Sequence, residues 1–186
     1  MTLEELWQLF PIVLREHNPE YKEWYLQEKE KIEKTVGQNE IKRINHIGSS
    51  AVEGLPAKPT VDILLEVDYN TNMETLAVKL KNAGWTLMSV EKEPGLKMAF
   101  NKGYTPNGFA ERVFHLHLRF LGDWDELYFR DYLLTHKEVA KAYGELKLKL
   151  KEQFEHDRDG YTAAKTGFIS KWTKQARKDF GNRYRP

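Results

Sequence analysis

The sequence lacks cysteine, an excess of one charge sign and any long hydrophobic run. Without cysteine, disulfide bonds and thiolate chemistry are excluded. The 29 basic and 28 acidic side chains leave a formal net charge of +1, whereas a general nucleic-acid binder needs a strongly basic surface. No apolar run approaches the roughly 20 residues that span a bilayer, and residues 1–11 lack the features of a signal peptide. We therefore expect a soluble, cytoplasmic protein with no membrane partner and no general affinity for nucleic acid.

The residues that are present predict one mixed domain over residues 1–186. The chain is 40% hydrophobic and 12% aromatic, which is enough to bury a core. Hydrophobic periodicity indicates a helix at 20–36, a sheet core at 40–121 and a helical C-terminal part at 123–180. Within the sheet core we expect strands at 40–47, 60–67, 85–91, 97–104 and 112–121. Thr71 and Glu74 form a capping-box signature, which predicts a helix at about 72–83. This order is typical of an α+β fold.

A segment rich in glycine and serine follows the first expected strand, and it reads His46-Ile47-Gly48-Ser49-Ser50. The glycine allows a ligand to approach the backbone closely, and the amides and hydroxyls that follow can hold phosphate oxygens. Lys58, in the loop that comes next, is a further candidate phosphate contact. The alternative is structural, because Gly-Ser-Ser is also a common loop sequence.

A carboxylate interrupts the apolar strand at 60–67. Asp62 follows Ser49 by thirteen residues, and a buried carboxylate there needs a cation or hydrogen-bond donors. Side chains alternate along a strand, so Asp62, Leu64 and Glu66 share one face and the aliphatic residues share the other. Asp62 is therefore a candidate site residue, although strand-end acids also often bond to loop amides.

Ionisable residues alternate with apolar ones in the strand at 112–121. His115, His117 and Arg119 share one face, and the opposite face is formed by Phe114, Leu116, Leu118 and Phe120. Histidines two positions apart on a strand are separated by about 6.7 Å, a spacing that can hold one transition metal ion.

Two charged residues interrupt the apolar faces of the expected C-terminal helices. Viewed down the axis of one helix, Lys165 lies on the apolar face that Phe168 and Trp172 form. Asp131 lies on the apolar face of another helix. Lys165 either reaches a phosphate, pairs with Asp131 as a structural bridge, or extends its stem along apolar surface toward water. Residues 171–186 carry six basic side chains and one acidic one, which indicates either a phosphate-attracting tail or a solvated helix end.

Several segments resemble the GrpB-like family of the nucleotidyltransferase superfamily. The segments are HIGSSAVEGLPAKPTVDILLEV, FHLHLRF, FRDYLLTHKEVAKAYGELK and YTAAKTGFI, so the resemblance covers roughly residues 40–180. It implies a polymerase-β-type fold in which the Gly-Ser pair holds a nucleoside triphosphate and strand carboxylates hold Mg²⁺. Some members of the family are fused to dephospho-CoA kinase, which points toward nucleotide or cofactor metabolism.

The sequence departs from the superfamily pattern Asp-x-Asp, because Leu64 stands where the second carboxylate is expected. Glu66 lies about 13 Å from Asp62 along an extended strand, whereas paired catalytic metals lie about 3.5–4 Å apart. The resemblance places the His115 strand beside the Asp62 strand. Asp62, His115 and His117 together would suit Zn²⁺, Mn²⁺ or Fe²⁺ better than Mg²⁺. Alternatively the histidines and Arg119 bind phosphate, or the histidines only satisfy buried hydrogen bonds.

These features predict a metal-dependent enzyme that transfers or binds a nucleotide or phosphate group with a small-molecule acceptor. Asp62, His115 and His117 would be the catalytic residues and hold a divalent metal ion (Mg, Mn or Zn), and a nucleoside triphosphate would be the ligand. The predicted phosphate contacts are His46, Gly48, Ser49, Ser50, Lys58, Arg119 and Lys165. A non-catalytic nucleotide- or CoA-binding module and a metal-dependent hydrolase are the alternatives. Leu64 favours the binding module, and the polar face of the His115 strand favours an enzyme.

Overall fold

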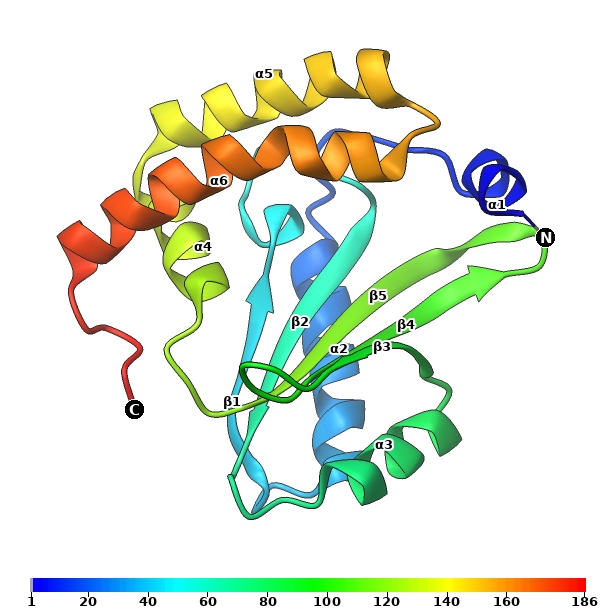
Figure 1. Cartoon of the computed structure of the whole chain (residues 1–186), viewed down its shortest axis with the longest axis vertical. Coiled ribbons are helices and arrows are strands. Elements are labelled where there is room, and N and C mark those ends of the chain that lie inside the picture. Colours follow the sequence, from blue (N-terminus) through cyan, green and yellow to red (C-terminus); the bar gives the residue numbers. More distant parts are fainter. Residues whose placement is uncertain (1) are drawn as a thin grey trace.

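A computed structural model describes residues 2–186 and shows a five-stranded mixed sheet with helices on both of its sides (Figure 1). Met1, which the expected domain of residues 1–186 includes, lies outside the described residues. The elements are α1 (Leu3–Leu9), α2 (Tyr21–Val36), β1 (Ile41–Ile47), the 3₁₀ turn η1 (Ser49–Ala51), β2 (Thr60–Val67), α3 (Met73–Asn82), β3 (Thr86–Glu91), β4 (Lys97–Thr105), β5 (Gly108–Phe120), α4 (Asp125–Thr135), α5 (Lys137–Phe154) and α6 (Arg158–Phe180).

The sheet has the strand order β1-β2-β5-β4-β3. β2 and β5 run parallel, and the other neighbouring strands are antiparallel. The parallel register places Asp62 opposite His115 and Leu64 opposite His117. The predicted α+β fold and the predicted proximity of these two strands are thus confirmed, and the charged residues of both strands lie together on one face.

The two faces of the central strands bury different groups. Val61, Ile63 and Leu65 of β2 pack with Leu116 and Leu118 of β5 in the main core, which α2 and α3 cover. On the opposite face, Leu64 packs in a small cluster with Ile47 and Leu127. An aromatic-rich cluster lies among α4, α5, α6 and the loop after η1. This cluster contains Val52 and Leu55, so the helical part of the chain holds the glycine–serine loop in place.

Two local predictions are wrong, and one helix was not predicted. The N-cap of α3 is Asn72 and not Thr71, because the Asn72 side chain accepts from the backbone nitrogen of Thr75 at 3.0 Å. β5 begins at Gly108, four residues before the expected start, because it pairs with β4 up to the hairpin turn. α1 was not predicted. In residues 2–186 no helix is long and apolar enough to cross a membrane.

Candidate phosphate-binding site

A cavity of about 640 Å³ lies between the sheet and the C-terminal helices, and its size is within the range of about 300–1,000 Å³ that is common for small-molecule sites. Most of the predicted site residues line it: Gly48, Ser49, Ser50, Lys58, Asp62, His115, His117 and Lys165. His46 and Arg119 do not. The walls come from the end of β1, the loop before β2, strands β2 and β5, and helices α4, α5 and α6.

Gly48 is the residue at which the backbone turns from β1 into the cavity wall. Its φ of 73° and ψ of −174° lie in a region that is essentially restricted to glycine. A Cβ atom at this position would lie 2.8 Å from the Asp62 Oδ2 atom. The glycine is therefore required both for the backbone conformation and for the close approach of the Asp62 carboxylate.

Asp62 is bound by both histidines of β5. His115 donates from Nδ1 to the Asp62 Oδ1 atom at 3.2 Å, and His117 Nε2 lies 3.7 Å from the same oxygen. The other ring nitrogen of His115 accepts from the Tyr104 hydroxyl at 2.8 Å. Burial by itself raises the pKa of the Asp62 carboxyl, but the hydrogen bonds of the two histidines hold that pKa well below its usual range. Asp62 is therefore ionised at neutral pH.

The same contacts decide how well these side chains fit a metal ion. Both His115 nitrogens have protein partners, and the donors of His115 and His117 are directed at one carboxylate oxygen. Across residues 2–186 no group of three histidine or acidic side chains is arranged to hold a metal ion. In this arrangement Asp62, His115 and His117 do not fit a metal centre, because their contacts are made with one another and with Tyr104. Binding of Mg²⁺, Mn²⁺ or Zn²⁺ there stays a prediction.

Three lysines surround the glycine–serine turn. Lys147 on α5 is 2% exposed, and its ammonium group donates to Ser49 Oγ at 2.9 Å and to the Pro56 carbonyl. Burial lowers the pKa of Lys147 to about 7 and that of Lys58 to about 8. Burial also lowers the pKa of Lys165. Each lysine therefore lies where a positive charge is poorly compensated by the protein.

Lys147 is a site residue that the sequence interpretation missed. It lies four residues after Tyr143 and three before Leu150, on the buried face of α5. A charge in the middle of an apolar helix face is the signal that indicated Lys165, and it also applies to Lys147.

One of the predicted alternatives, a salt bridge between Lys165 and Asp131, is wrong. The Asp131 carboxylate pairs instead with Arg130 at 2.9 Å and Arg183 at 3.0 Å, and it accepts from the Tyr184 hydroxyl. The Lys165 ammonium group lies 4.4 Å from the centre of the Tyr161 ring and lines the cavity. Arg183 belongs to the basic C-terminal segment, so part of that segment compensates a structural charge.

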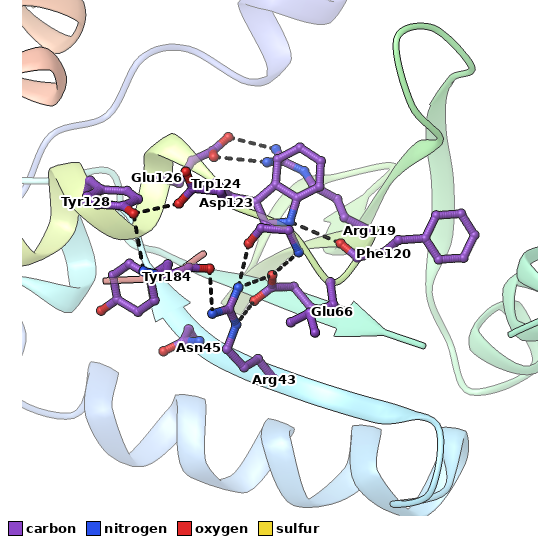
Figure 2. Close-up of polar contacts among 12 residues, drawn as sticks. Arg43, Asn45, Glu66, Arg119, Phe120, Asp123, Trp124, Glu126, Tyr128 and Tyr184 are labelled. Atoms are coloured by element: carbon purple, nitrogen blue, oxygen red, sulfur yellow. Dashed lines mark hydrogen bonds and ion pairs between the residues drawn. The ribbon is translucent and has the colours of Figure 1, made fainter. Parts of the chain in front are cut away.

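Two of the predicted phosphate contacts are occupied by structural interactions. The Arg119 guanidinium makes a bidentate pair with Glu126, with nitrogen–oxygen distances of 2.9 and 2.7 Å, beside the Trp124 ring (Figure 2). His46 lies behind the cavity wall, stacked on Tyr25, with its Nε2 atom 2.9 Å from Ser50 Oγ. Burial lowers the pKa of His46 to about 4, so this imidazole is neutral at pH 7 and orients Ser50.

Glu66 is likewise held away from the site. The Arg43 guanidinium donates to both of its carboxylate oxygens at 2.8 and 2.7 Å, and the Gly122 amide donates to one of them at 3.1 Å (Figure 2). Glu66 therefore compensates Arg43 and does not replace the carboxylate that is absent at Leu64.

The mixed sheet, with a glycine–serine turn after one strand and Asp62 on the next, defines a protein of the nucleotidyltransferase-like fold. The structure of the Cid1 poly(U) polymerase bound to MgGTP shares this fold, with a TM-score of 0.53 over 87% of this chain and 52% of that chain. At 10% identity this likeness concerns the fold alone. The chain belongs to the GrpB family, because residues 11–175 match the GrpB protein family.

Relatives and a solved structure support the same assignment. The chain is 30% identical over 161 residues to glutamate-rich protein GrpB of Alkalihalophilus pseudofirmus, which covers 85% of this chain and 91% of that protein. It is 36% identical over 129 residues to the UPF0157 protein PA4798 of Pseudomonas aeruginosa, or 69% of this chain and 52% of that one. The crystal structure of the conserved protein GrpB from Enterococcus faecalis matches with a TM-score of 0.79 and 27% identity, over 90% and 99% of the two chains. The resemblance found in the sequence is confirmed.

Proposed function

We propose that the cavity binds the phosphate groups of a nucleotide or a related small molecule. The observation that carries the proposal is the set of three cations beside the glycine–serine turn. None of Lys58, Lys147 and Lys165 makes an ion pair within the part of the chain from residue 2 to residue 186.

The carboxylates of the cavity wall form no ion pair with these lysines. The charge of Asp62 acts to raise the pKa of all three, but Asp62 is itself bound by His115 and His117. Two acids of α4 pair with arginines, namely Asp125 with Arg177 and Glu126 with Arg119. Lys147 is buried, and Lys58 and Lys165 are partly buried. Such cations are unfavourable without an ion-pair partner, and a phosphate chain supplies the missing negative charge. Ser49, Ser50 and the backbone at Gly48 would provide hydrogen bonds to the same phosphates.

Transfer of a nucleotidyl or phosphoryl group to a small-molecule acceptor is the second candidate function. It is favoured by the two imidazoles beside Asp62, because histidine is the side chain most often used as a general acid or base. His117 lines the cavity and has Asp62 as its one ion-pair partner among the described residues. Leu64, which cannot bind a metal ion, favours ligand binding without transfer.

Replacing Lys165 by methionine tests the proposed binding. Lys165→Met keeps the apolar stem and removes a charge that has no carboxylate partner, so the free energy of unfolding should be unchanged or slightly higher. The affinity for ATP should fall about tenfold or more, the loss expected for a hydrogen bond to a charged group. Calorimetric titration with ATP, ADP and coenzyme A, each in EDTA and in Mg²⁺ or Mn²⁺, measures the affinity, and urea denaturation measures the stability.

Lys171→Met is the matched control, because Lys171 lies on the same helix and does not line the cavity. It should leave the affinity for ATP unchanged. A loss above about 3 kcal/mol of stability, which is typical of a broken buried ion pair, together with unchanged affinity for all three ligands, would contradict the proposal.

The lowered lysine pKa values predict a pH dependence of binding. As the pH rises from 7 to 9 it starts at the pKa of Lys147, about 7, and passes that of Lys58, about 8. The lysines then lose their charge, whereas a terminal phosphate, with a pKa of about 6, is already mostly ionised at the start of this range. The affinity for ATP should therefore fall over this range, as measured by titrations at constant ionic strength.

The free protein should show the opposite trend in stability. In the unfolded chain the lysines keep their usual pKa of 10.5, so above pH 7 the unfolded state binds more protons than the folded state. The lysine contribution to stability therefore rises with pH between about 7 and 10. Lys147→Met should flatten part of both curves, and an affinity for ATP that is constant or increases from pH 7 to 9 would be inconsistent with lysine-dominated binding.

A further inference from the structure

A second cavity of about 280 Å³ adjoins the phosphate site and shares Lys58 and Thr60 with it. Besides the end of the loop before β2, three further regions that are distant in sequence form its walls: the segment after α1, the hairpin ends of β4 and β5, and the start of α6. Figure 1 shows these regions at the same end of the molecule. Contacts join them, because Phe10 packs on Tyr104 with ring centres 5.0 Å apart and the Ile12 amide donates to the Glu155 carbonyl at 3.0 Å.

The cavity combines an apolar lining with three cations, Arg15, Lys58 and Arg158, and one carboxylate, Glu111, so its charged lining is positive on balance. Pro11, Val13 and Phe109 form apolar wall. Arg158 also lines the cavity, and its Nε atom is buried without a hydrogen-bond partner. The Arg158 guanidinium makes no ion pair within residues 2–186. A buried donor without an acceptor is unfavourable, so an anion placed here would satisfy a group that the protein leaves unpaired.

A hydrogen-bonded chain connects the two cavities. Tyr104 lines the second cavity and donates to His115, which donates to Asp62, and both of these residues line the first cavity. Burial raises the pKa of the Tyr104 phenol, and the nearby charge of Arg158 acts in the opposite direction. A ligand bound against Tyr104 and Arg158 would therefore contact the same chain of side chains that positions Asp62.

We propose that the second cavity binds a small organic carboxylate whose apolar body is about the size of a six-membered ring. Arg158 would bind the carboxylate, because guanidinium groups match the geometry of carboxylates and hold them with two hydrogen bonds. Phe109, Pro11 and Val13 would contact the apolar body. This site does not depend on the proposed nucleotide binding, since its cation, its apolar wall and its unpaired donor are its own. In an enzyme, this position would suit the second substrate.

The probe is 4-fluorobenzoate, with 4-fluorobenzyl alcohol as the uncharged analogue, and binding to the full chain is followed by fluorine NMR line broadening. We expect saturable binding of the carboxylate and clearly weaker binding of the alcohol. Arg158→Gln should weaken carboxylate binding about tenfold, the loss expected for a charge-assisted hydrogen bond. Ala110→Trp, which places a large side chain in the cavity wall, should abolish binding without removing any cation.

Lys165→Met is the control that separates the two cavities, because Lys165 lines the first and not the second. It should leave 4-fluorobenzoate binding unchanged. If Lys165→Met weakens the binding of 4-fluorobenzoate and Arg158→Gln does not, the carboxylate occupies the phosphate site and the proposal is overturned. It is also overturned by equal binding of the alcohol and the carboxylate, or by the absence of saturable binding. These outcomes are independent of the ATP titrations, so either proposal can fail alone.

Discussion

Arg43→Met should lower the free energy of unfolding by about 3–5 kcal/mol, the range measured when one partner of a buried ion pair is removed. Glu66 is 0% exposed, and Arg43 supplies two of its three hydrogen bonds. Arg43 also donates to the Gly122 carbonyl at 2.6 Å and to the Tyr184 carbonyl at 3.1 Å. Its removal leaves a buried carboxylate without its cation and deletes one hydrogen bond between the sheet and the C-terminal segment. Urea denaturation measures the loss.

Two controls identify the source of this effect. Lys34→Met removes the partner of Glu30 in an exposed pair and should leave the free energy of unfolding almost unchanged. Arg43→Met combined with Glu66→Leu should recover much of the loss, because both charges are then absent. A double variant as unstable as the single one would show that packing of the Arg43 stem, and not its charge, stabilises this region.

Gly48→Ala should lower both stability and ligand affinity. The backbone conformation of Gly48 is unfavourable for alanine by about 1–3 kcal/mol, and the new Cβ atom would lie 2.8 Å from Asp62 Oδ2. Relief of this contact requires Asp62 to move away from His115 or the turn to move away from Lys147. We therefore expect a fall in the free energy of unfolding together with loss of measurable ATP binding.

Gly54→Ala is the matched control. Gly54 also has a positive φ, of 79°, but no heavy atom lies within 4 Å of the position of its Cβ atom. The Gly54→Ala variant should have the backbone strain without the contact with Asp62. It should therefore lose stability and keep its affinity for ATP. If the two variants bind ATP equally, the close approach of Gly48 and Asp62 is not needed for the site.

The sequence predicted those features of the site that depend on residues close together in the chain. Alternation along β2 and β5 predicted which side chains share a face, because successive residues of any strand point to opposite sides. This placed Asp62, His115 and His117 on the face that lines the cavity. The glycine at position 48 predicted a turn at the strand end, since few other residues adopt its φ.

Contacts between segments that are distant in the sequence could not be predicted in this way. The alternation that placed Arg119 on the same face as His115 did not reveal that Glu126, on the next helix, takes its charge. The pairing of Lys165 with Asp131 was equally compatible with the sequence, and it is absent because Arg130 and Arg183 reach the same carboxylate. Lys147 follows the same pattern as Lys165, but the pattern does not distinguish a lysine that is buried by a distant loop from one whose long stem reaches water.

The sequence by itself therefore determined most of the elements, the two faces of the central strands, the glycine–serine segment and the family, all of which depend on local geometry or on matching segments. Tertiary structure alone decided which charges remain without a partner. Arg43, Arg119 and Arg130 are compensated by acids, whereas Lys58, Lys147, Lys165 and Arg158 gather around two adjoining cavities. The reason is physical: an ion pair depends on a separation of a few ångströms and on burial, and both are fixed only when segments far apart in the chain pack together.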